Sequence, residues 1–376
     1  MSPAATADAE LDALVAACWP RAQGHWSRFL LLQPPADGPE QEAIAQIDLA
    51  TRRIGLHYRL IRRKCLEDCV EALMAHEVGH HVRYPGTLTT QARLRLLEKA
   101  ILPLDNYSVV NLFTDLLIND ALWPALGDHL ARVYRAFTAD VTAGADPAFL
   151  FYLSLYEERH GLEPGALMGP CGKAFARDHP NYRAESQLLG QDLFHLGPNL
   201  FTQFLYFVSI ISRYVALDGA GGQGPDCGCG EPSPDDWADA LTPTAREQEA
   251  IRRAEAEGWI RRELAKRMAD RDALARRIST LPGAGGDDAT RVPEVMAAYY
   301  RRQADRYLLR PPPRLVLGEA TTPTTLEEWE PGDPLRDVDW PATLTQRGPL
   351  LGAAQPLRRQ RVPEAEGWEV PLWQPR

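Results

Sequence analysis

The chain has 376 residues, of which 45% are hydrophobic and 24% are charged, so it is long enough for one large domain or two smaller ones, each with a hydrophobic core. Its formal net charge of −10 at pH 7 gives no general attraction to nucleic acid or to an anionic membrane, and we expect neither as a partner. Six cysteines are too few for a disulfide scaffold in so long a chain. Acidic residues also stand near the N-terminus where a secretory signal needs basic ones, so we expect a cytoplasmic protein.

The first predicted element is a β-hairpin within residues 43–61. Apolar side chains recur there at every second position on both sides of a polar turn, namely Ile47, Leu49, Ile54, Leu56 and Tyr58. Alternation of this kind is typical of strands that bury one face.

Helices are predicted next, at residues 66–82, 89–101, 106–122, 128–138, 147–160 and 199–217. The first ends at Tyr84-Pro85-Gly86, because proline and glycine together stop a helix. The last is the most apolar stretch of the chain, but its uninterrupted core, residues 204–211, is far shorter than the roughly 20 residues that a membrane span needs. We therefore predict a buried helix there and no membrane segment.

The composition changes after residue 217. Glycine, proline and aspartate dominate residues 218–236, which predicts a linker. Thr244 and Glu247 form a capping box for a helix predicted to run to residue 278, and a second helix is predicted from Pro293, so that residues 237–310 form a helical segment. Residues 311–376 contain 12 prolines and four tryptophans and predict an extended tail that docks onto something.

The stretch "EALMAHEVGHHVRYPG", residues 71–86, carries the candidate chemistry. His76 and His80 lie four residues apart on a predicted helix, about 40° apart around its axis and about 6 Å along it, so both can reach one Zn²⁺. Glu77 follows His76 and stands beside the metal, where it can take a proton from water as a general base. His81 points a further 100° away, which places it at the rim of the site or behind the ligands.

A catalytic zinc needs a third protein ligand, and Asp115 is the best candidate. Its predicted helix is apolar on nearly the whole surface, yet Asn111, Asp115 and Asn119 recur on it every four residues. A buried carboxylate needs partners, and metal coordination by Asp115, with the two asparagines orienting the ligands, provides them. A polar seam between helices without a metal is the alternative. Glu98, Asp105 and Asp120 are rival ligands, and Asp120 is the best of these because it adjoins the stripe.

These residues carry a resemblance. "HEVGHH", followed about 30 residues later by "NLFTDLLIND", resembles the zincin metallopeptidases, and among them the bacterial metallopeptidase domains that accompany von Willebrand factor A (VWA) domains and MoxR-type AAA+ ATPases. The resemblance covers roughly residues 40–125. It implies His76, His80 and Asp115 as zinc ligands and Glu77 as general base, in agreement with the spacing.

A weaker resemblance lies in the tail. "WEPGDPLRDVDWP", residues 329–341, is similar to the segment that precedes many VWA domains. The sequence does not contain the Asp-x-Ser-x-Ser metal site of such a domain, so we expect the tail to contact a separate VWA protein.

We therefore predict a helix-rich α+β fold: a zincin-like domain over residues 1–217, a linker over 218–236, a helical segment over 237–310 and an extended tail over 311–376. The predicted function is zinc-dependent hydrolysis of a peptide or protein, with substrate backbone pairing with an edge of the hairpin. The alternative is a catalytically inactive adaptor in an ATPase and VWA assembly, which a fourth protein ligand such as His81 or Asp120 would favour. A zinc hydrolase that acts on something other than peptides ranks last.

Overall fold

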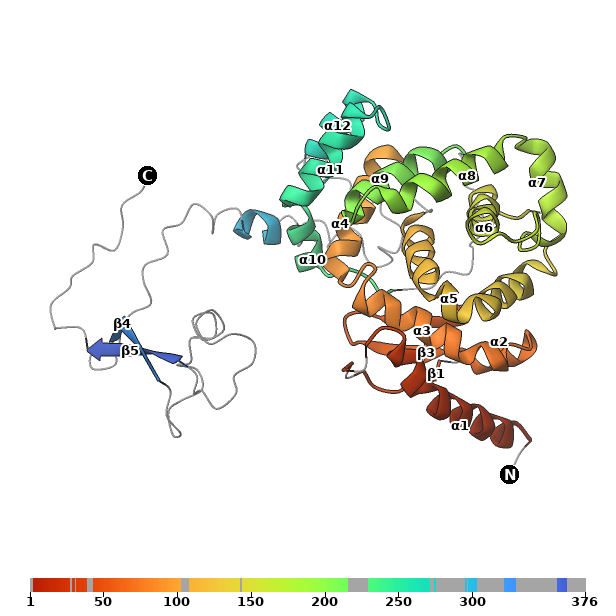
Figure 1. The fold of residues 1–376 in the computed structure, drawn as a ribbon, viewed down its shortest axis with the longest axis horizontal. Coiled ribbons are helices and arrows are strands. Elements are labelled where there is room, and N and C mark those ends of the chain that lie inside the picture. Colours follow the sequence, from red (N-terminus) through yellow and green to blue (C-terminus); the bar gives the residue numbers. More distant parts are fainter. Residues whose placement is uncertain are drawn as a thin grey trace. The chain divides into compact units, whose positions relative to one another are not determined.

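The structure is a computed structural model that describes residues 3–27, 29–30, 32–38, 43–102, 108–142, 144–215, 229–270, 274, 295, 297–302, 321–328 and 357–363. The chain forms two units, residues 1–302 and residues 303–376. Within the described part, the first unit is a helix-rich α+β fold with one small sheet (Figure 1). No helix of the described residues combines the length and the apolar character that crossing a membrane requires.

In the first unit the three strands lie between α1 and α2 in the chain, and the described elements after them are helices. The described elements are, in chain order, α1 (Pro3–Gly24), β1 (Ala36–Asp37), β2 (Ala45–Asp48), β3 (Arg53–Leu56), α2 (Tyr58–Arg63), η1 (Glu67–Cys69), α3 (Val70–Val82), α4 (Leu88–Ile101), α5 (Val110–Thr138), α6 (Pro147–His160), η2 (Gly169–Cys171), α7 (Gly172–Asp178), α8 (Tyr182–Asp192), η3 (Leu193–His195), α9 (Leu200–Ile211), α10 (Pro234–Ala240), α11 (Ala245–Ala256) and α12 (Arg262–Ala269).

The predicted hairpin is confirmed as β2 and β3. They pair antiparallel with Ala45 opposite Leu56 and Asp48 opposite Arg53. The described sheet has the strand order β1–β3–β2, with β1 parallel to β3. Helix α3 packs against β2 and α1 on one side and against α5 on the other (Figure 1).

Helices whose ends are set by local chemistry match their predictions closely. Helix α6 spans the predicted residues 147–160, with Asp146 as N-cap and Gly161 in the left-handed region at its end. Helix α4 begins one residue before its predicted start because the Thr87 hydroxyl caps it. Helix α3 ends at Val82 as predicted, but it begins at Val70 instead of residue 66, because a 3₁₀ turn precedes it.

The two helices predicted at 106–122 and 128–138 are wrong as separate elements, because α5 is one helix from Val110 to Thr138. Proline inside a helix removes a hydrogen bond and usually kinks or ends it. Helix α5 continues past Pro124 because Leu122 and Leu126, on either side, are both buried in one hydrophobic cluster with the sheet and α3.

Two further predictions need correction near residues 234 and 258. Helix α10 begins at Pro234, inside the predicted linker, because Ser233 and Asp236 form a capping box. The single helix predicted over residues 244–278 is wrong over its described part, because α11 ends before Gly258, which has a φ of 73°, and α12 begins at Arg262. A positive φ is inexpensive for glycine and does not continue a helix.

The second unit, by its described residues, consists of β4 (Thr321–Glu328) and β5 (Leu357–Pro363), which pair antiparallel. The four tail tryptophans and the segment that resembles a pre-VWA sequence, residues 329–341, lie outside the described residues.

Candidate metal centre

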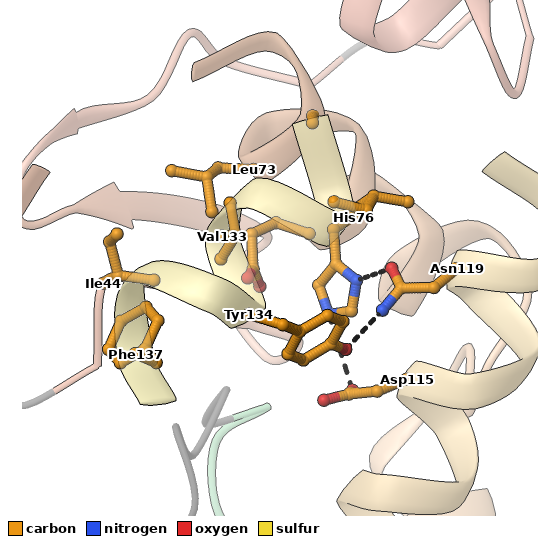
Figure 2. A pocket seen from close by; sticks show the side chains of 11 residues that line it. Ile44, Leu73, His76, Asp115, Asn119, Val133, Tyr134 and Phe137 are labelled. Carbon is orange, nitrogen blue, oxygen red and sulfur yellow. Dashed lines mark hydrogen bonds and ion pairs between the residues drawn. The ribbon is translucent and has the colours of Figure 1, made fainter. Parts of the chain in front are cut away.

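Three buried side chains from α3 and α5 converge on one point. His80 Nε2 lies 3.1 Å from His76 Nε2, and Asp115 Oδ1 lies 3.4 Å from the first histidine's Nε2 and 3.2 Å from the second's. Among the described residues, these three side chains are the one group of at least three histidines, cysteines or acidic residues whose ligand atoms lie close enough to hold a metal ion. The structure thus brings together the three predicted ligands, of which Figure 2 shows His76 and Asp115.

The distances between these three atoms fit a zinc ion. Two imidazole nitrogens and a carboxylate oxygen are ligand types that zinc accepts, and ligands at 2.0–2.1 Å in a tetrahedron are about 3.4 Å apart. The observed separations of 3.1–3.4 Å therefore describe one face of such a tetrahedron.

The outer nitrogens of both rings have fixed partners. His80 Nδ1 lies 2.8 Å from the main-chain oxygen of Tyr84, and a carbonyl oxygen only accepts, so this Nδ1 carries the proton. His76 Nδ1 lies 2.7 Å from Asn119 Oδ1 (Figure 2). Partners of this kind orient metal-binding histidines in known sites. The Nε2 lone pair of His80 is therefore directed at the shared point.

A glycine sets the spacing between α3 and α5. A Cβ atom on Gly79 would lie 2.6 Å from a ring carbon of Trp26 and 2.7 Å from Cγ2 of Ile118 on α5, and real Cβ atoms do not approach so closely. The indole of Trp26 also donates to the Ala75 carbonyl at 2.6 Å. The sequence thus uses glycine inside this helix so that α5, with Asp115 one turn before Ile118, can approach the histidines.

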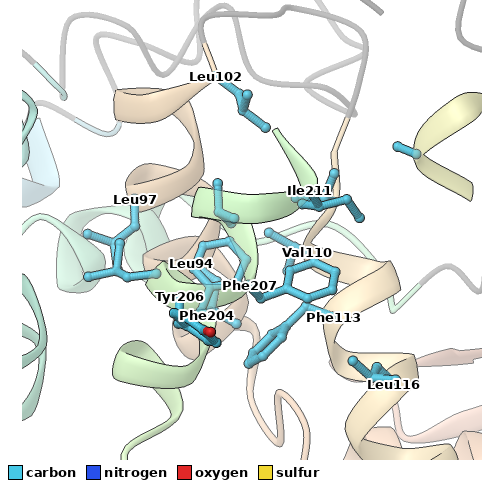
Figure 3. Packing of buried hydrophobic residues seen from close by; sticks show 14 of the residues in the cluster. Leu94, Leu97, Leu102, Val110, Phe113, Leu116, Phe204, Tyr206, Phe207 and Ile211 are labelled. Carbon is cyan, nitrogen blue, oxygen red and sulfur yellow. The ribbon is translucent and has the colours of Figure 1, made fainter. Parts of the chain in front are cut away.

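Helix α5 is buried because two hydrophobic clusters meet on it. One face, which includes Ile118 and Leu130, packs with the sheet, α1 and α3. Another, which includes Phe113 and Leu116, packs with α4, α6 and α9 (Figure 3). The prediction that residues 106–122 form a helix buried almost all round is confirmed for residues 110–120, whereas Ala121, Ala125 and Arg132 further along α5 are exposed. Asp115 lies between Phe113 of one cluster and Ile118 of the other.

The first turn of α5 is held by a carboxylate from another helix. Glu98 of α4 accepts hydrogen bonds from the Val109 amide and, at 2.9 Å, from the Ser108 hydroxyl. The first amides of a helix have no partners within it, so this carboxylate takes the place of a side-chain cap. Glu98 therefore positions the helix that carries Asp115 and is not part of the triad.

Glu77 lies beside the triad in one pocket. The pocket has a volume of about 40 Å³, which holds a few water molecules. Its polar lining residues are His76, Glu77, Asp115, Asn119 and Tyr134, and the remaining wall is apolar, formed by Ile44, Ala72, Leu73, Leu130, Val133 and Phe137 (Figure 2). Glu77 is 1% exposed and His80 is fully buried. The arrangement can therefore exchange a proton between Glu77 and a water held in the pocket.

The charge state of Asp115 suits a ligand. Burial alone raises the pKa of this carboxyl, but the charge and hydrogen bonds of the His76 and His80 rings in their protonated form outweigh the burial and lower the pKa below its ordinary value. A carboxylate that stays ionised among imidazoles attracts a cation.

The structure separates the remaining candidates. Asn119 contacts the triad as predicted, through His76. Asp120 points elsewhere, because Arg159 pairs with it at 2.8 Å. His81 is half-buried, and burial, followed by the charge of Arg52, lowers its pKa. His81 and Asp120 are therefore not members of the triad group within the described residues.

Two candidates remain as predictions. Asn111 is half-buried one turn before Asp115 on α5, and a contact of its side chain with the ligands stays a prediction. Asp105 lies outside the described residues.

The tyrosines behind Asn119 were not predicted. Asn119 Nδ2 donates to the Tyr134 hydroxyl at 2.7 Å (Figure 2), and Tyr156 of α6 donates to the Asp115 main-chain oxygen at 3.0 Å. Tyr152 and Tyr156 share one face of α6 at a spacing of four residues, which is a usable signal, but their partners come from another helix.

Comparison of the chain with protein-family models, with curated proteins and with solved structures found no match.

Proposed function

We propose that this protein is a zinc-dependent peptidase in which His76, His80 and Asp115 hold the metal and Glu77 is the general base. The observation that supports the proposal most is the triangle of 3.1–3.4 Å formed by two imidazole nitrogens and a carboxylate oxygen, with a second carboxylate in the same pocket. The zincin resemblance supports it independently, since it assigns the same residues the same roles.

The chain's own groups account for the proton transfers. Zinc bound at the triad would polarise a substrate carbonyl and lower the pKa of a water molecule. Glu77 accepts a proton as the water oxygen bonds to the carbonyl carbon. It returns the proton to the amide nitrogen as the carbon–nitrogen bond breaks and the amine leaves. The apolar wall of the pocket limits competing water, which strengthens electrostatic interactions inside it.

Strand β2 is the edge along which we propose that substrate binds. It is the last strand in the described order β1–β3–β2, and Ile44, directly before it, lines the pocket. Directly after β2 the Leu49 amide donates to the Cys229 carbonyl, so a substrate would pair along the end of the strand near Ile44. An extended peptide added to an exposed edge gains main-chain hydrogen bonds.

The first test is metal content, measured by elemental mass spectrometry on purified wild-type, His80→Ala and Asp115→Ala proteins. We expect about one zinc per wild-type chain and much less in both variants, because a site with two protein ligands binds weakly. Zinc that is absent from the wild type, or that is indifferent to Asp115, would contradict the proposal. Glu77→Gln should keep its zinc and lose cleavage of an unfolded protein substrate, and retained cleavage would remove Glu77 from the role of base.

An inactive adaptor remains the second candidate, and the burial of the centre favours it. Glu77 is 1% exposed, Asp115 is 6% exposed and His80 is fully buried, so a peptide reaches the metal only if the surrounding side chains move. A small hydroxamate such as acetohydroxamate separates the two, since it binds zinc only where a coordination position is open. Calorimetric binding to the zinc protein would support the peptidase, and no binding would support a closed, structural metal.

The proposed partners, a VWA protein and a MoxR-type AAA+ ATPase, rest on the resemblance. The test is a pull-down of the full chain and of a chain that ends at residue 302, each against both partners. Loss of the VWA protein from the shorter chain is expected, and equal capture by both chains would contradict a role of the tail.

A further inference from the structure

A row of three tyrosine hydroxyls connects two parts of the candidate metal centre. Tyr134 Oη lies 2.7 Å from Tyr152 Oη, and Tyr152 Oη lies 3.3 Å from Tyr156 Oη. One end of the row meets Asn119, which contacts His76, and the other end meets the main-chain oxygen of Asp115. We call these three residues the tyrosine row.

The direction of every hydrogen bond in the row follows from its last acceptor. The main-chain oxygen of Asp115 can only accept, so Tyr156 donates to it. A phenol has one proton, so Tyr156 accepts from Tyr152, and Tyr152 in turn accepts from Tyr134. The Tyr134 hydroxyl also accepts from the side chain of Asn119.

The direction of these bonds also determines which nitrogen of His76 is protonated. Because Asn119 presents its NH₂ group to Tyr134, it presents Oδ1 to His76. An amide oxygen accepts, so Nδ1 of His76 carries a proton, and in the neutral ring Nε2 carries the lone pair. This lone pair faces Asp115 and His80 Nε2 at the triad. An imidazole in the other tautomer could not bind a metal through Nε2.

We infer that Tyr134, Tyr152 and Tyr156 are positioning residues that hold His76 in the tautomer whose Nε2 lone pair faces the metal. The inference rests on the proposed metal site and adds residues that act through Asn119 without touching the metal. It also gives a reason for three phenols in a core that could be filled by phenylalanine at a lower desolvation cost.

The surroundings keep the row ordered. Tyr152 is 1% exposed and Tyr156 is fully buried, and their rings pack edge to face with centroids 5.0 Å apart. Burial raises the pKa of both hydroxyls well above the ordinary value. The phenols therefore remain protonated at physiological pH, and the packing leaves little room for water to reverse the direction of the row.

The test compares Tyr134→Phe, Tyr152→Phe and Tyr156→Phe, each of which removes one oxygen and keeps the ring. Zinc affinity is measured by competition with a chromophoric chelator. Changes behind metal ligands typically cost about 10- to 100-fold in affinity, and we expect about 10-fold weaker binding for Tyr134→Phe, with smaller losses for the other two. The matched control is Tyr206→Phe, because Tyr206 is also buried in the helical core but donates to Asp192. Its zinc affinity should stay within about twofold of wild type.

A second measurement reads the tautomer directly. Long-range ¹H–¹⁵N spectra of metal-free protein labelled in histidine distinguish the two neutral tautomers, and the His76 signals are assigned by their loss in His76→Gln. We expect the Nδ1-protonated form in the wild type and in Tyr206→Phe, and a mixture of forms in Tyr134→Phe.

The outcomes separate this inference from the proposed function. Variants of the row that lose only stability, with wild-type zinc affinity and an unchanged His76 tautomer, would overturn the positioning role. A wild-type protein that binds no zinc would overturn the proposed function, whereas the spectrum of the metal-free protein would still report whether the row sets the tautomer.

Discussion

At the scale of single residues, each of the three candidate ligands is fixed by a hydrogen bond on the side that faces away from the shared point. His80 is fixed by the Tyr84 carbonyl and His76 by Asn119. Asp115 is fixed through its main chain by Tyr156. A site built this way meets a metal with its ligands already oriented, so little of the binding free energy is lost in ordering them.

Gly79 is the residue where a single added methyl group should disturb this arrangement. Alanine is favoured over glycine in a helix by about 1 kcal/mol, but the new Cβ would overlap Trp26 and Ile118, and overpacking costs about 1–3 kcal/mol. We expect Gly79→Ala to lower the free energy of unfolding by roughly 1 kcal/mol and to weaken zinc binding, because α5 must move away from α3. Urea unfolding and chelator competition measure the two effects.

Gly190 provides the control for that substitution. It also lies inside a helix, α8, but its added Cβ would meet the flexible end of Leu155 at 3.3 Å. Gly190→Ala should leave zinc affinity unchanged and should not lower stability. Equal effects of the two substitutions would mean that the spacing of α3 and α5 is not set by Gly79.

At the scale of elements, prediction from the sequence succeeds where the deciding contacts are local. The ends of α6 could be predicted because Asp146 caps it and Gly161 ends it. His76 and His80 could be predicted as neighbours because their four-residue spacing places both on one face of a single helix. Asp115 lies on another helix, and it could be proposed as their partner only because a buried carboxylate is costly without one.

Prediction fails where packing between distant segments decides. The continuation of α5 through Pro124 depends on a cluster that it shares with the sheet. The tyrosine row depends on how α6 lies against α5, which no local pattern specifies. The role of Glu98 depends in the same way on α4 meeting the start of α5.

That contact between α4 and α5 predicts a pH dependence of stability. Burial raises the pKa of Glu98 to about 7, although the bond from Val109 opposes the shift. Since the unfolded carboxyl titrates near 4.3, the folded state binds the extra proton between these values. The bound proton contributes its full share to the free energy of unfolding below about pH 4. This share, on the order of 3 kcal/mol, is lost as the pH rises to about 7.

The variant Glu98→Gln isolates this contribution. Glutamine does not ionise and can still accept from Val109 and donate to Ser108, so the stability of wild type relative to the variant should fall between pH 5 and pH 8. Burial lowers the pKa of His160 to about 4, so its titration makes both proteins more stable as pH rises. This effect is the same in the two proteins and disappears from the difference between them. A constant difference in urea unfolding across this range would show that Glu98 does not carry the buried proton.

At the scale of the whole molecule, the helices after residue 228 complete the body that contains the metal centre. Arg93 of α4 bonds to the carbonyls of Asp239 and Thr242 and pairs with Glu247, which is fully buried. Trp237 and several residues of α10 and α11 belong to the same hydrophobic cluster as α4, α5 and α9. The compact unit accordingly extends to Arg302.

This arrangement predicts that a chain ending at residue 215 does not fold stably, whereas a chain ending at residue 302 does. The shorter chain loses the following buried side chains from the cluster: Trp237, Ala238, Leu241, Ala250, Ile251 and Ala254. Burial of each large apolar side chain contributes about 1.5–3 kcal/mol, and whole domains are stable by only about 5–15 kcal/mol. Loss of this set, together with exposure of the α4 surface beneath it, therefore removes most of the available stability. Circular dichroism with urea should show a cooperative transition, and zinc binding, only in the longer chain. A cooperative, zinc-binding chain that ends at residue 215 would instead mark residues 1–215 as a complete domain to which α10–α12 are added.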